Sequence, residues 1–179
     1  MRRMILRMGR RFLRLLMRPV FGLEQLGPIV ALRTLFFQKF LRINGHVPWP
    51  VHPSTHIKAP KKIVRGTRFP GLSAGCHIDG RNGIEFGRNV WVGPNVAIIS
   101  MNHDMLDFRR YEAADPIRIG DNSWLGIRTV ILPGVVLGPH TVVAAGAVVT
   151  QSFPEGDQVL GGVPARVIRK LEPYHGASE

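Results

Sequence analysis

The chain has 179 residues, enough for one domain with a sizeable core and an additional segment. Cys76 is the only cysteine, which excludes a disulfide framework and a zinc site built from several cysteines, and favours a cytoplasmic protein. The formal net charge of +12 is uneven, because residues 1–45 hold ten Arg and Lys against Glu24 alone, giving +9 and leaving +3 for the rest. The basic character therefore belongs to the N-terminal segment.

Residues 1–45 are expected to form a basic amphipathic helical extension. On a helical wheel, arginines fill one third of the circumference, apolar residues lie opposite, and Pro19 is placed to end the helix. The arginines are Arg3, Arg7, Arg10, Arg11, Arg14 and Arg18, and the apolar residues are Ile5, Met8, Phe12, Leu15 and Leu16. Such a helix suits the surface of an anionic membrane. Packing on its own domain or on a neighbouring copy is the alternative.

Three other interpretations of this segment are disfavoured. Arginine recurs every three or four positions, so the uncharged run of a signal peptide is missing. The second apolar stretch, residues 28–43, contains Arg33, Lys39 and Arg42 and is too charged to span a bilayer. No motif that reads DNA or RNA accompanies the charge, so nucleic acid is not an expected partner.

From Phe86 onward the sequence repeats every six residues. The units are FGRNVW, VGPNVA and IISMNH, followed after an interruption by IGDNSW, LGIRTV, ILPGVV, LGPHTV and VAAGAV. The first position is always large and apolar, and the second is Gly in five of the eight units. This predicts a triangular solenoid in which three units close one coil, with roughly five coils over residues 55–155. Apolar first residues should stack inward, and Gly at the second position should adopt the unusual dihedral angles of the turns.

Three stretches resemble a known enzyme family. PIRIGDNSWLGIRTVILPGVVLGPHTVVAAGAVVTQSFPEGDQVLGGVPARVIRKL, residues 116–171, resembles the C-terminal half of the galactoside and maltose O-acetyltransferases. HVPWPVHPSTHI and NGIEFGRNVWVGPNVAIISMNHD are similar to relatives that O-acetylate surface polysaccharides. The resemblance implies an all-β fold, a left-handed parallel β-helix, over residues 46–171. An inserted loop near 104–116 and a C-terminal tail of residues 172–179 complete the expected organisation.

The resemblance assigns the general base to His103, which stands where the repeat is interrupted by SMNHDMLDF. An alcohol is a poor nucleophile until its proton is being removed, and a neutral imidazole can remove it. The partner that orients the imidazole stays open between Asp104, Asp79 and a backbone carbonyl. Asn102 and Asp104 are candidates for positioning the substrate or supporting the loop.

The resemblance also implies where acetyl-CoA, the expected co-substrate, would bind. The backbone of Gly126 and Ile127 would face the thioester carbonyl as an oxyanion site, with Trp124 near the acceptor and the pantetheine arm. The family's contacts to the rest of the cofactor match Ala145, Gly146, Thr150, Arg166 and Arg169. Gln151 stands where relatives often carry Lys.

The sequence therefore predicts an acetyl-CoA-dependent O-acetyltransferase that acts on a sugar hydroxyl of an envelope polysaccharide or its precursor. The resemblance implies a homotrimer with active sites between neighbouring copies, and no metal is expected. The basic segment 1–45 suggests a cytoplasmic enzyme at the inner face of the membrane.

Other functions on the same fold stay open. Serine or an amino sugar is an alternative acceptor, a longer acyl chain is an alternative donor group, and a non-catalytic β-helix scaffold is a different class of function. A zinc carbonic anhydrase would need a second histidine close after His103, for example five residues on, where this chain has Phe108.

Overall fold

The computed structural model describes residues 26–176; the amphipathic helix predicted to end at Pro19 lies outside the described residues. The described chain begins with helix α2 (Pro28–Thr34), which continues directly into a π-helical stretch, η2 (Leu35–Phe40). The buried side of this helix packs through Gln38, whose amide donates to the Trp49 carbonyl at 3.1 Å and accepts from the Val51 N–H at 3.0 Å. No helix among the described residues is long and apolar enough to cross a bilayer.

The opposite side of the same helix is apolar and exposed. Ile29, Leu32, Phe36 and Phe40 are three or four residues apart and form one stripe, in which the rings of Phe36 and Phe40 stack with centroids 5.8 Å apart. The helix therefore packs on its own domain with one face and leaves an apolar face uncovered.

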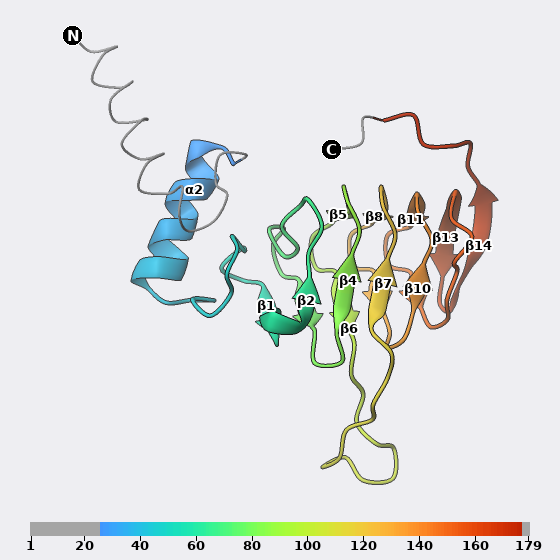
Figure 1. The fold of residues 1–179 in the computed structure, drawn as a ribbon, viewed down its shortest axis with the longest axis horizontal. Coiled ribbons are helices and arrows are strands. Elements are labelled where there is room, and N and C mark those ends of the chain that lie inside the picture. The colour runs from blue at the N-terminus through green and yellow to red at the C-terminus, as the bar shows by residue number, and fades with distance from the viewer. Residues whose placement is uncertain (1–25, 177–179) are drawn as a thin grey trace.

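The rest of the chain forms a parallel β-helix of three sheets, as the repeat predicted (Figure 1). Sheet A contains β1 (His56–Lys58), β3 (His77–Asp79), β6 (Ala97–Ile99), β9 (Val130–Ile131) and β12 (Val148–Val149). Sheet B contains β2 (Ile63–Val64), β4 (Ile84–Phe86), β7 (Ile117–Ile119) and β10 (Val136–Leu137). Sheet C contains β5 (Trp91–Val92), β8 (Trp124–Leu125), β11 (Thr141–Val143), β13 (Gln158–Gly162) and β14 (Ala165–Lys170).

The core consists of ladders of apolar residues that are in register from coil to coil. In sheet A, Ile57 pairs with Ile78, Ile78 with Ile98, and Ile98 with Ile131, and all four are buried. The first residue of nearly every hexapeptide is buried, so the predicted inward stacking is confirmed. A short 3-10 turn, η3 (Pro60–Lys62), connects β1 to β2.

The glycines at the second repeat position have a different role from the predicted one. The positive φ angles of the turns fall on the fourth position, for example at Asn122 (57°) and Gly134 (73°), whereas Gly120 and Gly126 at the second position do not have positive φ. A Cβ on Gly120 would lie 2.5 Å from the backbone nitrogen of Pro139 in the next coil. The second position is therefore glycine because successive coils approach closely there. The prediction of unusual dihedral angles at this position is wrong.

The C-terminal residues close the β-helix and then run back along it. β14 pairs antiparallel with β13, unlike the parallel pairs of the other coils. Beyond β14, the Tyr174 hydroxyl accepts a hydrogen bond from the Asn89 side chain at 3.1 Å, and its ring lies edge-on to His140. The described part of the predicted tail is therefore attached to the coils (Figure 1).

Candidate active site

His103 lies at the base of a loop that leaves the β-helix between β6 and β7 and projects away from the coils (Figure 1). His103 and Tyr111 form an isolated antiparallel bridge, and the Asp104 N–H donates to the Arg110 carbonyl at 3.1 Å. The loop is therefore a narrow hairpin whose two sides are joined directly beside the histidine.

The imidazole of His103 is oriented by a backbone carbonyl. Its Nδ1 lies 2.5 Å from the carbonyl oxygen of Phe108, across the tip of the loop. Because a carbonyl oxygen can only accept, Nδ1 carries the proton and the lone pair of the neutral ring is on Nε2. Of the three partners left open by the sequence, the structure selects the carbonyl.

The two residues that flank His103 shape the loop. The Asp104 carboxylate accepts from the N–H groups of Leu106 and Asp107 at 2.7 and 3.2 Å, which caps the turn at the loop tip. The Asn102 carbonyl accepts from the Glu112 N–H at 3.0 Å and closes the base of the loop. The Asp104 side chain therefore supports the loop, whereas the Asn102 contact comes from its backbone and does not depend on the asparagine side chain.

A stack of side chains lies against the histidine ring, and of its members the sequence pointed only to Asp79. The Tyr111 ring lies 4.5 Å from the His103 ring, and the Arg81 guanidinium lies 4.5 Å from the Tyr111 ring centroid. Arg81 in turn donates to both carboxylate oxygens of Asp79, at 2.8–3.0 Å. Burial alone would raise the pKa of Asp79, but the hydrogen bonds from Arg81 outweigh it and hold the pKa below its ordinary value.

One row of outward-facing residues crosses all five strands of sheet C. Trp91 pairs with Trp124, Trp124 with Val142, Val142 with Val159, and Val159 with Arg169. A register shift between Val159 and Leu160 brings Arg169 into this row, so it shares one face with the predicted site residue Trp124. Arg166 belongs to the same strand and is exposed, and its guanidinium donates to the Ala165 carbonyl at 2.8 Å.

The turn after Trp124 contains one free backbone donor. The Gly126 N–H, a predicted oxyanion donor, is occupied by a hydrogen bond to the Val143 carbonyl at 2.8 Å. Within the described chain, the Ile127 N–H makes no hydrogen bond to another backbone group, so this residue carries the donor that remains. Ala145 and Gly146 occupy the same turn in the next coil, where the Gly146 N–H donates to the Ile127 carbonyl at 2.9 Å.

A single chain does not bring the two halves of the predicted site together. His103 follows sheet A at the corner between sheets A and B, which lies opposite sheet C in a three-sided coil. Trp124 lies on sheet C, and the turn of Ile127 lies at the corner between sheets C and A. Thr150 is exposed just after β12 of sheet A, so it lies at the corner between sheets A and B, as His103 does, but two coils further on. Among residues 26–176, no three His, Cys, Asp or Glu side chains lie together as metal ligands would.

Comparisons with known proteins agree with this architecture. Residues 116–151 match the family model described as bacterial transferase hexapeptide (six repeats). The galactoside O-acetyltransferase of Escherichia coli is 38% identical over 91 residues, which are 49% of this chain and 44% of that protein. The matched region spans less than half the length of the curated relatives.

Solved structures give matches that extend over more of the chain. A maltose O-acetyltransferase from Clostridium difficile is 32% identical, with a TM-score of 0.57, over 66% of this chain and 64% of that one. A hexapeptide-repeat-containing acetyltransferase from Vibrio cholerae, complexed with acetyl coenzyme A, is 32% identical, with a TM-score of 0.55, over 69% of this chain and 68% of that one. With the repeat, the register of its coils and these matches, the chain belongs to the hexapeptide-repeat acetyltransferase family.

Proposed function

We propose that this protein transfers an acetyl group from acetyl-CoA to a sugar hydroxyl, with His103 as the general base. The observation that supports this most strongly is the hydrogen bond between Nδ1 of His103 and the Phe108 carbonyl. It leaves Nε2 of the neutral imidazole as a proton acceptor on an exposed histidine. In other enzymes too, a hydrogen-bond acceptor on the other ring nitrogen orients the catalytic histidine, and here the Phe108 carbonyl has that role.

In this mechanism Nε2 of His103 accepts the proton of the sugar hydroxyl. The oxygen of that hydroxyl attacks the thioester carbonyl carbon at the same time. The Ile127 N–H donates to the oxygen on which negative charge develops. When the carbon–sulfur bond breaks, the same imidazole returns the proton to the departing sulfur. The products are the acetylated sugar and free coenzyme A, and His103 ends in its starting state.

The residues of sheet C fit acetyl-CoA as the donor. Arg166 and Arg169 are exposed at one end of the sheet and are suited to the phosphates of the nucleotide end. The Ile127 N–H lies nearer the middle of the β-helix, at a turn where the thioester would have to be. A relative that is 32% identical has been solved in complex with acetyl coenzyme A.

The site would be completed between neighbouring copies in a homotrimer. The supporting observation is topological, because His103 and sheet C belong to opposite sides of one chain. The projecting loop also carries the exposed apolar side chains Met105, Leu106 and Phe108, which a neighbouring copy would cover.

A sugar is the proposed acceptor, as part of an envelope polysaccharide or its precursor. The names of the galactoside and maltose O-acetyltransferase relatives support a sugar hydroxyl in preference to serine. The exposed stripe of α2 and η2, together with the charge of residues 1–45, supports a place at the inner face of the membrane, where lipid-linked glycans are assembled.

Acetyl transfer from acetyl-CoA to a panel of sugars tests the proposal. His103→Ala should lower the rate by about 10²–10⁴-fold, because proton removal from the hydroxyl is lost. His56→Ala, which removes an exposed histidine on β1, is the matched control and should leave the rate unchanged. An unchanged rate in His103→Ala, with the fold intact by circular dichroism, would contradict the mechanism.

A further inference from the structure

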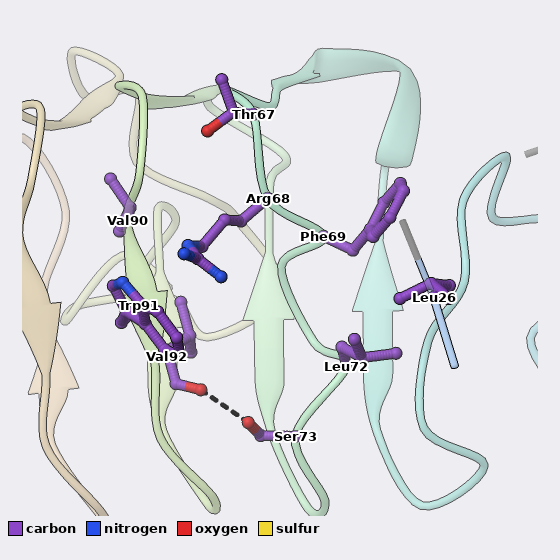
Figure 2. Close-up of a pocket in the computed structure, with 9 residues that line it drawn as sticks. All are labelled: Leu26, Thr67, Arg68, Phe69, Leu72, Ser73, Val90, Trp91 and Val92. Carbon is purple, nitrogen blue, oxygen red and sulfur yellow. Dashed lines mark hydrogen bonds between the residues drawn. The ribbon is translucent and has the colours of Figure 1, made fainter. Parts of the chain in front are cut away.

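A pocket of about 520 Å³ lies at the N-terminal end of sheet C, outside the residues assigned to acetyl transfer. β5 is the edge strand of this sheet, and the irregular segment 67–73 runs beside it. Figure 2 shows Trp91 and Arg68 on one side of the pocket and Phe69 and Leu72 on the other, with Leu26 next to them. The pocket is therefore a space between an aromatic wall and an apolar wall.

The aromatic wall is held in place by a buried side chain. The Arg68 guanidinium lies 3.5 Å from the centroid of the Trp91 ring, and both Arg68 Nε and Trp91 Nε1 donate to Asn89 Oδ1, at 2.9 and 3.0 Å. Asn89 is only 3% exposed, and its side chain donates in turn to Asn122 and Tyr174. Indole and guanidinium are therefore fixed before any ligand arrives, which lowers the entropy cost of binding.

The chemistry of this wall suits a sugar ring. Trp91 is 53% exposed and the Arg68 guanidinium lies over one face of its ring, so a ligand can contact the part of the indole that the guanidinium leaves uncovered. A sugar has an apolar face of C–H groups, which packs on aromatic surface, and a rim of hydroxyls, which bond to polar groups. The Thr67 hydroxyl accepts from the Asn89 N–H and can still donate, and the Ser73 hydroxyl donates to the Val92 carbonyl and can still accept. The volume is in the range of small-molecule pockets and accommodates about one or two sugar units.

The position of the pocket relates it to the proposed reaction. Trp91 is the direct neighbour of Trp124 in the cross-strand row, about 5 Å away along the β-helix. Arg169 stands at the opposite end of the same row, where the nucleotide end of the donor is proposed to bind. The donor would therefore approach the site from β14, which leaves the β5 end for the acceptor.

We propose that the pocket between β5 and residues 67–73 is a glycan subsite, which holds the sugar units next to the one that is acetylated. This inference rests on the proposed function for its place in the reaction, whereas binding of sugar to the pocket can be measured without turnover. Trp91 is its recognition residue, and Arg68 is held against the Trp91 ring.

Binding is measured by saturation-transfer NMR on the full chain without acetyl-CoA, with lactose, cellobiose, N,N′-diacetylchitobiose and glucuronic acid as probes. At least one probe should receive saturation from the wild type, and Trp91→Ala should reduce that signal at least about fivefold. Trp91→Phe, which keeps an aromatic face, should retain part of it. Phe40→Ala removes an exposed aromatic ring on η2 that does not line the pocket, and should retain all of it.

Turnover separates this inference from the proposed function. With a disaccharide acceptor, Trp91→Ala should raise KM about tenfold with little change in kcat, and a monosaccharide acceptor should be unaffected. If the wild type transfers acetyl groups but Trp91→Ala binds and turns over disaccharides normally, or if no probe binds the wild type, the subsite is overturned. If probes bind through Trp91 but no acetyl group is transferred, the subsite stands and the proposed function fails.

Discussion

The third residue of each hexapeptide occupies the same place in its turn, and three of these residues are prolines: Pro94, Pro133 and Pro139. Ile127 has the equivalent place, so the backbone there should accommodate proline as well. Ile127→Pro removes the free N–H and should lower kcat about 10²–10³-fold, the usual effect of losing one oxyanion donor.

Steady-state kinetics of this variant need a control that changes only the side chain. Ile127→Ala keeps the backbone donor and should retain kcat within about threefold. Thermal unfolding of both variants establishes that the coil is intact. Equal activity of the proline and alanine variants would remove Ile127 from the mechanism.

Among single residues, the sequence predicts His103 as the general base but does not predict the groups that support it. The Phe108 carbonyl belongs to the backbone of a loop without a repeat, and a backbone acceptor leaves no pattern in the sequence. The stack of Tyr111, Arg81 and Asp79 joins residues from two successive coils, so it emerges only when the register of the coils is known. The hydrogen bond from the Gly126 N–H to the Val143 carbonyl depends on the same register.

Among the elements, the turns show two separate reasons for glycine, and three alanine substitutions can distinguish them. Gly120→Ala places a Cβ against the next coil and should lower the free energy of unfolding by about 2 kcal/mol or more. Gly134→Ala has free space but a φ of +73°, and should cost about 1 kcal/mol. Gly27→Ala has neither problem and should change stability by less than about 0.5 kcal/mol.

Chemical denaturation of the three variants measures these differences. If Gly120→Ala were as stable as Gly27→Ala, close approach of the coils would not explain the glycine at the second position. The period of the repeat predicted the strands and the inward residues correctly because each unit must present one apolar side chain to the core. It could not predict the role of the glycines, because a close contact and an unusual dihedral angle favour the same residue.

The exposed apolar face of α2 and η2 is the part of the described structure that we propose to contact the membrane. Replacing Phe36 and Phe40 together by Ser removes apolar area and should reduce co-sedimentation with phosphatidylglycerol-containing vesicles about tenfold. Val64→Ser changes an exposed apolar residue on sheet B and should have no effect. Unchanged binding of the double variant would show that this face does not contact the membrane.

For the whole molecule, the opposite placement of His103 and sheet C predicts complementation between two inactive variants. In a homotrimer assembled from equal amounts of His103→Ala and Ile127→Pro chains, about a quarter of shared sites would contain both intact groups. Co-expression should therefore restore about a quarter of the wild-type activity. Each variant expressed alone is the control, and a mixture without activity would show that the site lies within one chain.

The contacts of the C-terminal tail affect how the β-helix unfolds. In a solenoid each coil contacts only its neighbours, so the terminal coils can fray independently of the middle. Here Tyr174 is bound to Asn89, 85 positions earlier in the chain, by a contact that spans several coils. Fraying of the last coil must break this hydrogen bond. The tail therefore couples the opening of distant coils and makes unfolding of the β-helix more cooperative.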